Sequence, residues 1–189
     1  MTPLPPATGA ELELNATAAS LLGFLSAGPQ SGYELAARIE ATIGPFWNVT
    51  RSQIYRELRV LEAAGCIAVG ETGSRDRRPY ALTVAGRAAF RAWIAREPGD
   101  ENIRFPLLLT AFFGDALPRA ELARTLRAHR ARHEARLARY RERHPAVERD
   151  HPYPALTSRF GIMYEEMVLA WFATLAADGL LDDPAPEAG

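Results

Sequence analysis

The spacing of apolar residues in this chain changes at Gly65. Before this glycine they recur every three to four residues, which is the period of an amphipathic helix. The clearest examples are Ile54, Leu58 and Leu61. After it, Cys66–Val69 and Tyr80–Leu82 have the length and composition of short β-strands, and Gly70–Pro79 between them is rich in turn-forming residues. The change of period therefore predicts helices followed by one β-hairpin.

Four helices are predicted in this half of the chain, each behind a residue that can cap its first turn. Ser31 with Glu34, and Thr50 with Gln53, have the spacing of a capping box, in which two residues satisfy each other's free backbone N–H groups. Gly65 stands where a glycine commonly ends a helix. The predicted caps, in chain order, are Asn15 or Thr17, Ser31, Thr50 and Thr83.

The order helix, helix, helix, strand, basic turn, strand, helix is that of a winged helix-turn-helix domain, which we assign to residues 15–97. Residues 1–14 contain three prolines and no periodic apolar pattern, and are predicted to form a flexible arm. The predicted fold class is mainly α with a small β-hairpin wing, followed by a C-terminal α-helical dimerisation domain.

The second half of the chain is predicted to be helical throughout. Residues 98–101 form the expected junction, residues 102–181 the helical dimerisation domain, and residues 182–189 a flexible tail. His144–Pro154 contains three prolines and is expected to break the chain between the last two helices. The predicted helices are Ile103–Phe113, Arg119–Arg143 and Ala155–Ala177.

An apolar seam along the last helix favours dimerisation. Its spacing is close to a heptad, and such a surface is too apolar to leave in water. An intramolecular core against Ile103–Phe113 could account for part of the seam. The residues assigned to dimerisation are Phe160, Met163, Met167, Trp171 and Leu175.

The helix Thr50–Ala64 carries the pattern that points to DNA. Its outer face is cationic and polar, and a helix of this kind fits the major groove with its first two turns at the base edges. Arginines on the predicted wing could follow the phosphate backbone or enter a minor groove. A solvated amphipathic face and a merely soluble hairpin tip are the alternatives. The residues assigned to DNA binding are Thr50, Arg51, Ser52, Gln53, Tyr55, Arg56, Arg59, Arg75, Arg77, Arg78 and Tyr80.

Several spaced motifs resemble the PadR family of transcriptional regulators. They are LLGFL at Leu21–Leu25, SGYEL at Ser31–Leu35, SQIYRELRVLEAAGCI at Ser52–Ile67, and RPYALT at Arg78–Thr83 with Gly86. The resemblance covers about residues 21–96. It implies a homodimer that binds an inverted-repeat operator, usually as a repressor of nearby genes and often relieved by a small ligand, with Thr50–Ala64 as recognition helix and Gly70–Pro79 as wing.

The C-terminal half is similar to the larger PadR subgroup, whose members dimerise through several helices. Gly161, Glu165 and Trp171 stand roughly where that subgroup has such residues in its final helix. Two positions depart from the family pattern. Cys66 stands where leucine is more common, and Pro79 stands where many relatives carry a wing cation.

A small-molecule effector and a metal were also considered. Phe112, Tyr164 and Trp171 could line an effector pocket, but a plain packed core is the favoured interpretation, because aromatic stripes usually serve packing. His129 and His133 lie one helical turn apart, a spacing that can chelate a metal, but neighbouring arginines would repel a cation. We therefore expect no metal site and no cofactor.

The remaining composition narrows the function classes. The net charge of −1 argues against indiscriminate nucleic-acid binding, and all 22 basic residues are arginines. The lone Cys66 fits a reducing cytoplasm, no uninterrupted apolar run reaches about 20 residues, and no catalytic motif is present. The sequence thus predicts a cytoplasmic, non-enzymatic DNA-binding regulator with no membrane partner. The alternatives are a winged-helix protein-interaction module without DNA binding, and a metal- or ligand-sensing protein.

Overall fold

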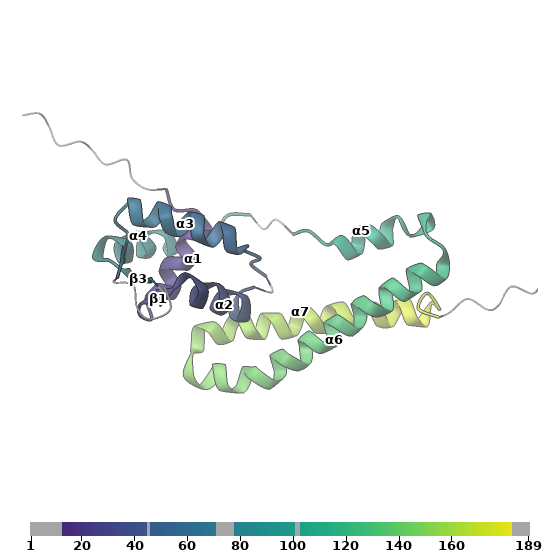
Figure 1. Ribbon diagram of the computed structural model, residues 1–189. Helices are drawn as coiled ribbons and strands as arrows, with labels where there is room; N and C mark the ends of the chain where they lie inside the picture. Colours follow the sequence, from purple (N-terminus) through teal and green to yellow (C-terminus); the bar gives the residue numbers. More distant parts are fainter. Residues whose placement is uncertain (1–12, 45, 71–77, 101–102, 183–189) are drawn as a thin grey trace, which may run out of the picture. The chain divides into compact units, whose positions relative to one another are not determined.

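The chain divides after Asp100 into two compact units, each with its own core (Figure 1). The computed structural model describes residues 13–44, 46–70, 78–100 and 103–182. The wing residues 71–77, with Arg75 and Arg77, and the predicted tail 183–189 lie outside the described residues.

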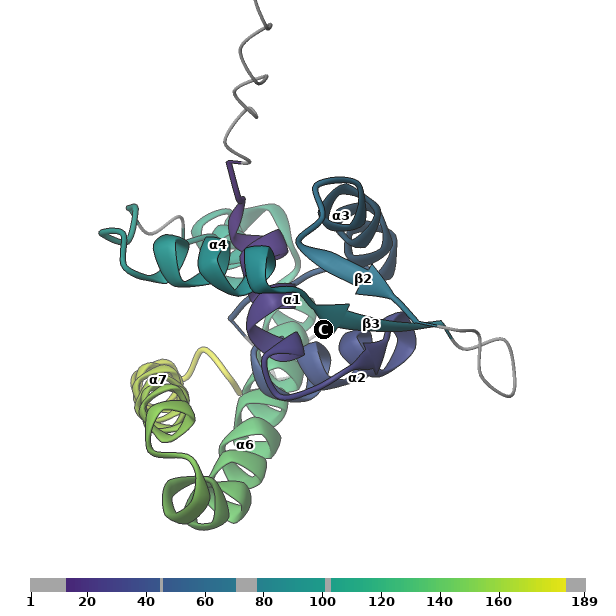
Figure 2. The ribbon, with the colours of Figure 1, turned by 90° about the vertical axis from the view of Figure 1, so that its left-hand side faces the viewer.

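The first unit contains helices around a three-stranded antiparallel sheet with strand order β1-β3-β2. Figure 2 shows β2 and β3 side by side in this sheet. The predicted hairpin is confirmed, with Ile67 opposite Leu82 and Val69 opposite Tyr80. The two-residue strand β1, paired with β3, was not predicted. The elements are α1 (Ala16–Leu25), β1 (Gln30–Ser31), α2 (Gly32–Thr42), α3 (Arg51–Ala63), β2 (Ile67–Val69), β3 (Pro79–Leu82) and α4 (Val84–Ile94).

The helix starts follow the predicted caps. Of the two candidates for α1, Asn15 is the cap, and its side chain accepts a hydrogen bond from the backbone N–H of Ala18. Ser31 and Thr50 both form complete capping boxes, and Thr83 caps α4. Behind α3, Gly65 has a φ of 69°, a left-handed conformation that glycine adopts without steric cost.

The core of this unit lies between α1, α2, α3 and the sheet. We expected residues 1–14 to form a flexible arm. At Leu14 this prediction is wrong, because Leu14 is only 5% exposed and belongs to this core. The apolar side chain of Leu14 is thus part of the folded domain, and residues 1–12 lie outside the described residues. The other buried members are Ala18, Leu21, Leu22, Leu25, Leu35, Ala36, Ile39, Ile54, Leu58, Leu61, Cys66 and Ile67.

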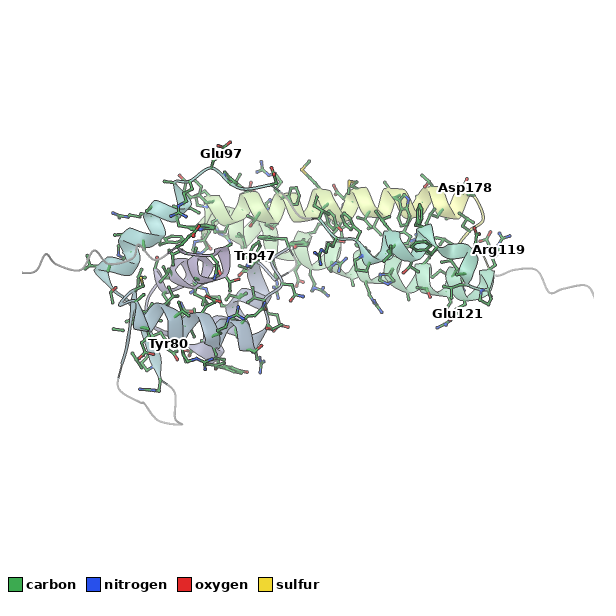
Figure 3. The ribbon with its side chains drawn as sticks, turned by 90° about the horizontal axis from the view of Figure 1, so that it is seen from above. Trp47, Tyr80, Glu97, Arg119, Glu121 and Asp178 are labelled. Carbon is green, nitrogen blue, oxygen red and sulfur yellow. The ribbon has the colours of Figure 1, made fainter. Side chains whose placement is uncertain are left out.

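The second unit is built on two long helices that lie side by side (Figure 1). At one end of this pair Arg119 donates a hydrogen bond to the carbonyl of Gly179, close to Asp178 (Figure 3). The core contains Leu126, Val168, Phe172 and Leu181. The elements are α5 (Pro106–Phe112), the 3-10 turn η1 (Gly114–Ala116), α6 (Arg119–Asp150) and α7 (Pro152–Ala177).

Two helix boundaries in this unit differ from the prediction because prolines act differently from what we expected. The break expected over His144–Pro154 is present but is limited to His151, since α6 continues through Pro145 to Asp150 and α7 begins at Pro152. The last turns of α6 are held on α7 by an ion pair between Glu148 and Arg159 and by His144, whose Nδ1 lies 3.1 Å from the hydroxyl of Ser158.

The other proline effects occur at helix starts. Pro152 stands at the first turn of α7, where the missing N–H would have no partner anyway, so that α7 begins three residues before the predicted Ala155. Conversely, α5 does not begin at Ile103. Phe105 precedes Pro106 and is extended, with φ −114° and ψ 92°, as the residue before a proline prefers.

Candidate nucleic-acid interface

Helix α3 divides its side chains between the core and the solvent. Ile54, Leu58 and Leu61 are buried, as the periodicity predicted. The side chains of Thr50 and Gln53 are occupied at the helix start, where Gln53 Oε1 accepts from the backbone N–H of Thr50 at 2.8 Å. The exposed residues of the predicted set at the cap and along α3 are Thr50, Arg51, Ser52, Tyr55, Arg56 and Arg59. One helical face therefore carries donors and cations that no core contact requires.

Two exposed aromatic residues, Tyr33 of α2 and Tyr55 of α3, lie where these two helices meet. The guanidinium of Arg51 stands over the ring of Tyr33 in α2, 5.6 Å from the ring centroid. This cation–π contact limits the conformations of Arg51 while leaving its N–H groups accessible. We did not predict Tyr33. Its place in the first turn of α2, outside the apolar repeat of Leu35 and Ile39, is the signal that could have indicated an exposed residue.

Tyr55 rests against the start of α2. A Cβ added at Gly32 would lie 2.5 Å from Cε1 of the Tyr55 ring. Only glycine therefore allows the ring to approach α2 so closely. The hydroxyl oxygen of Tyr55 faces Gly32 as well, 3.1 Å from such a Cβ, and the residue as a whole remains 41% exposed.

A buried carboxylate, missed by the sequence analysis, lies on the same helix. Glu57 is 4% exposed, and its Oε1 accepts from Nε and Nη2 of Arg56 at 3.2 and 3.0 Å. Its Oε2 accepts from Nδ2 of Asn15 at 3.0 Å. The signal was available, because position 57 is three residues after Ile54 and four before Leu61, on the buried side of the helix.

Two further residues of the predicted DNA-binding set lie at the start of the sheet strand β3: Tyr80 in the strand and Arg78 directly before it. Burial raises the pKa of the Tyr80 phenol, Glu62 and Tyr55 raise it further, and Arg78 and Arg59 oppose this effect. The phenol therefore keeps its proton and can donate or accept a hydrogen bond. These electrostatic contacts connect the exposed Arg59 of α3 with the start of β3.

Only the base of the wing is described. The backbone N–H of Gly70 donates to the carbonyl of Pro79 at 2.8 Å and closes the hairpin there. Arg78 is exposed directly before β3, whereas Arg75 and Arg77 lie outside the described residues. A helix with an exposed cationic face, followed by a hairpin, has the elements needed to enter a major groove and to contact the adjacent backbone.

The residues assigned to dimerisation fall into two groups. Phe160, Met163 and Met167 are each about 60% exposed, at 65%, 62% and 59%. Trp171 and Leu175 are half-buried and pack against the core of the second unit. The apolar seam thus packs on the core at its C-terminal end and is exposed at its N-terminal end.

The three residues assigned to an effector pocket differ in environment. Phe112 is exposed, and its ring meets that of Phe113 edge to face, with centroids 4.9 Å apart. The Tyr164 ring stacks on Phe105 at 6.1 Å. Trp171, tilted against Phe172, belongs to the packed core.

His129 and His133 were considered as metal ligands, and His133 is bound to Glu165. Within the described ranges no group of three His, Cys, Asp or Glu side chains could hold a metal ion. We expected no segment capable of crossing a membrane, but α7 is long and apolar enough, with a mean hydropathy of 1.3. The same helix carries the buried Glu165 and lies along α6.

Each of the two units matches the model of a known protein family. Residues 21–92 match the model described as "Transcriptional regulator PadR-like family", and residues 103–178 match "Virulence activator alpha C-term". The negative transcriptional regulator PadR of Bacillus subtilis is 30% identical over 123 residues, which are 63% of this chain and 68% of that protein. The probable transcriptional regulator Rv1176c of Mycobacterium tuberculosis is 46% identical over 68 residues, 34% of this chain and 36% of that protein.

Solved structures share the fold over most of the chain. Bacillus subtilis PadR in complex with operator DNA superposes with a TM-score of 0.72, at 22% identity, over 87% of this chain and 98% of that one. The same protein in complex with p-coumaric acid gives 0.64 at 22% identity, over 90% and 99%. The Vibrio cholerae virulence activator AphA gives 0.64 at 21% identity, over 88% and 96%.

Proposed function

The chain belongs to the PadR-like family of transcriptional regulators, and on that premise we propose that it is a homodimeric repressor of nearby genes. In this proposal α3 of each copy reads one half of an inverted-repeat operator, and a small molecule releases the protein from DNA. The DNA-binding domain is residues 15–97 and the dimerisation domain residues 102–181. In this proposal the protein works in the cytoplasm, at the nucleoid.

The observation that carries the proposal is the exposed face of α3. This face carries three exposed arginines, Arg51, Arg56 and Arg59. The opposite face of the helix is packed into the core by Ile54, Leu58 and Leu61. Of the three arginines, only Arg56 has a carboxylate partner among the described residues. The similar Bacillus subtilis PadR has been crystallised with operator DNA, which supports DNA as the partner proposed here.

Dimerisation is proposed from the exposed stripe of α7. Phe160, Met163 and Met167 form a contiguous apolar surface that a second copy would remove from water. One recognition helix contacts too few base pairs for useful specificity. Two-fold pairing would place two such helices about 34 Å apart, one turn of the DNA duplex.

A small-molecule effector is proposed from the family relationship. The structure of Bacillus subtilis PadR with p-coumaric acid shows that a similar protein takes a phenolic acid. In this chain Phe112, Tyr164 and Trp171 remain the proposed contacts. A thermal-shift screen of phenolic acids, cationic drugs and divalent metals tests this part, and stabilisation by none of them would argue against it.

The experiment that tests DNA binding uses fragments from upstream of the protein's own gene. We expect retention of one such fragment at moderate salt where random DNA of equal length is released. Arg59→Ala should weaken binding to both DNAs and lower the slope of log Kd against log salt by about 1. Arg91→Ala, which removes an exposed arginine from α4, is the matched control and should leave both unchanged.

A protein-interaction module that has lost DNA binding is the alternative. Such a module would not need the exposed cations of α3. Equal retention of upstream and random fragments by the wild-type protein, with chemical-shift changes confined to the second unit when a partner is added, would favour this alternative and overturn the repressor proposal.

A further inference from the structure

Glu57 occupies an unusual position for an acid on a helix that is proposed to bind DNA. Its backbone lies on the core side of α3, and it is the only charged residue of the first unit that is buried within the described ranges. A buried carboxylate is strongly unfavourable unless hydrogen bonds or a cation compensate it. Arg56 and Asn15 supply that compensation, one at each carboxylate oxygen.

The orientation of the Asn15 amide makes an acceptor necessary at position 57. Oδ1 of Asn15 accepts from the backbone N–H of Ala18 as the cap of α1, at 2.8 Å. The Nδ2 group must therefore point the other way, toward Glu57. A carboxylate can accept from Asn15 and from Arg56 at the same time. A glutamine in its place would offer one oxygen and turn an N–H₂ group toward one of two donors.

The contact with Glu57 leaves one edge of Arg56 free. A guanidinium has five N–H donors in a rigid plane, and Glu57 takes two of them, through Nε and one N–H of Nη2. The three that remain (five minus two) are both N–H groups of Nη1 and one of Nη2. Arg56 is 62% exposed, so this edge is open to a ligand. Two parallel donors at the end of an arginine match O6 and N7 of guanine in the major groove.

We propose that Glu57 is a positioning residue that orients Arg56 to read a guanine of the operator, and that Asn15 holds Glu57 in place. The proposal rests on the DNA-binding function given above. Arg56, already ordered by Glu57, loses less conformational freedom when it binds a base. Its charge is balanced by Glu57, so that the pair adds little to the general attraction of phosphates. The pair acts on specificity, whereas Arg59 acts on overall affinity.

The test compares two equivalent substitutions on α3. Glu57→Gln removes the charge and one of the two contacts, and Glu62→Gln removes the same charge from an exposed position on the same helix. Kd is measured for an operator selected from random DNA by the wild-type protein, and for random DNA. The specificity ratio is the Kd for random DNA divided by the Kd for the operator. We expect Glu57→Gln to lower this ratio about tenfold, the size expected from losing one bidentate base contact. Glu62→Gln should tighten both DNAs alike and keep the ratio.

Variants of Arg56 separate positioning from a purely structural role. Arg56→Ala should lower the same ratio as far as Glu57→Gln does, and adding Glu57→Gln to Arg56→Ala should lower it no further. Arg56→Lys keeps the charge but loses the planar fork, and should also lower the ratio. An operator with 7-deazaguanine at the contacted base should lose affinity for the wild-type protein and not for Arg56→Ala. Circular dichroism of each variant confirms that it is folded.

Contrary results would overturn either the positioning role of Glu57, or base reading by Arg56, or the proposed function itself. If the wild-type protein separates operator from random DNA but Glu57→Gln keeps the full ratio, the positioning role is wrong and the proposed function stands. The same holds if Glu57→Gln lowers the ratio equally in the Arg56→Ala background. If Arg56→Ala weakens both DNAs alike, Arg56 binds phosphate and no base is read. If the wild-type protein does not separate the two DNAs, the proposed function fails together with this inference.

Discussion

Nδ1 of His133 lies 2.5 Å from Oε2 of Glu165, and both side chains are buried between α6 and α7. Nε of Arg136 donates to the other carboxylate oxygen at 2.8 Å. Glu165 therefore has two cationic or hydrogen-bonding partners from the neighbouring helix. This cluster fixes the register of the two long helices, because sliding one helix along the other would leave a buried charge without a partner.

Removing the centre of this cluster should destabilise the second unit. Glu165→Ala leaves the buried His133 and the half-buried Arg136 without their acceptor. We expect the free energy of unfolding to fall by about 3–5 kcal/mol. Glu166→Ala breaks only the exposed pair with Arg141 and should cost under about 1 kcal/mol. Urea unfolding followed by circular dichroism measures both. Equal losses for the two variants would contradict a special role of the buried carboxylate.

Gly161 should resist even the smallest enlargement. A Cβ added there would lie 2.6 Å from Cζ of Tyr140, so that the ring or the helix must move. We expect Gly161→Ala to lower the unfolding free energy by about 1–3 kcal/mol, as overpacking of a close contact does. Gly99→Ala, where nothing lies within 4 Å of the added Cβ, is the control. A midpoint in urea unchanged by Gly161→Ala would show that the helices can separate without cost.

Stability should decrease at alkaline pH. Burial, and then the charge of Glu165, raises the pKa of the Tyr140 and Tyr164 phenols, against an opposing effect of Arg136. A phenol with a higher pKa in the folded state contributes stability that is complete below its unfolded pKa of about 10. That contribution is lost as the pH rises through the folded value. The chain has no lysine, so that no ammonium groups titrate in this range.

The double variant Tyr140→Phe, Tyr164→Phe measures this effect. Its unfolding free energy should run parallel to that of the wild type between pH 7 and 9, and should fall less steeply above about pH 10. Denaturant titrations at half-unit pH steps give both curves. Identical slopes above pH 10 would mean that these phenols are not the source of the alkaline loss.

A single charge on the exposed stripe of α7 should separate the dimer. Met163→Glu places a carboxylate on the surface that we propose a second copy covers, and desolvating it there is unfavourable. Sedimentation velocity should show a monomer for Met163→Glu at concentrations where the wild type is a dimer. Ala173→Glu, also exposed on α7 but about 120° around the helix from Met167, should remain a dimer. A Met163→Glu dimer, or a wild-type monomer, would refute the proposed interface.

The sequence by itself determined the features that depend on near neighbours along the chain. Ser31 with Glu34 and Thr50 with Gln53 fixed two helix starts, and the spacing of Ile54, Leu58 and Leu61 fixed the buried face of α3. Capping boxes and helical repeats act between residues three or four apart. Their outcome can therefore be predicted without knowledge of the rest of the fold.

Tertiary structure decided what depends on residues far apart in the chain. Both carboxylate oxygens of the buried Glu57 have partners because Asn15, 42 positions earlier in the chain, donates to the oxygen that Arg56 does not contact. Pro145 remains inside α6 because α7 holds the last turns, and β1 exists only as a partner of β3. Desolvation and pairing set these outcomes, and both depend on which surfaces meet when the chain folds, a quantity that no local pattern of residues contains.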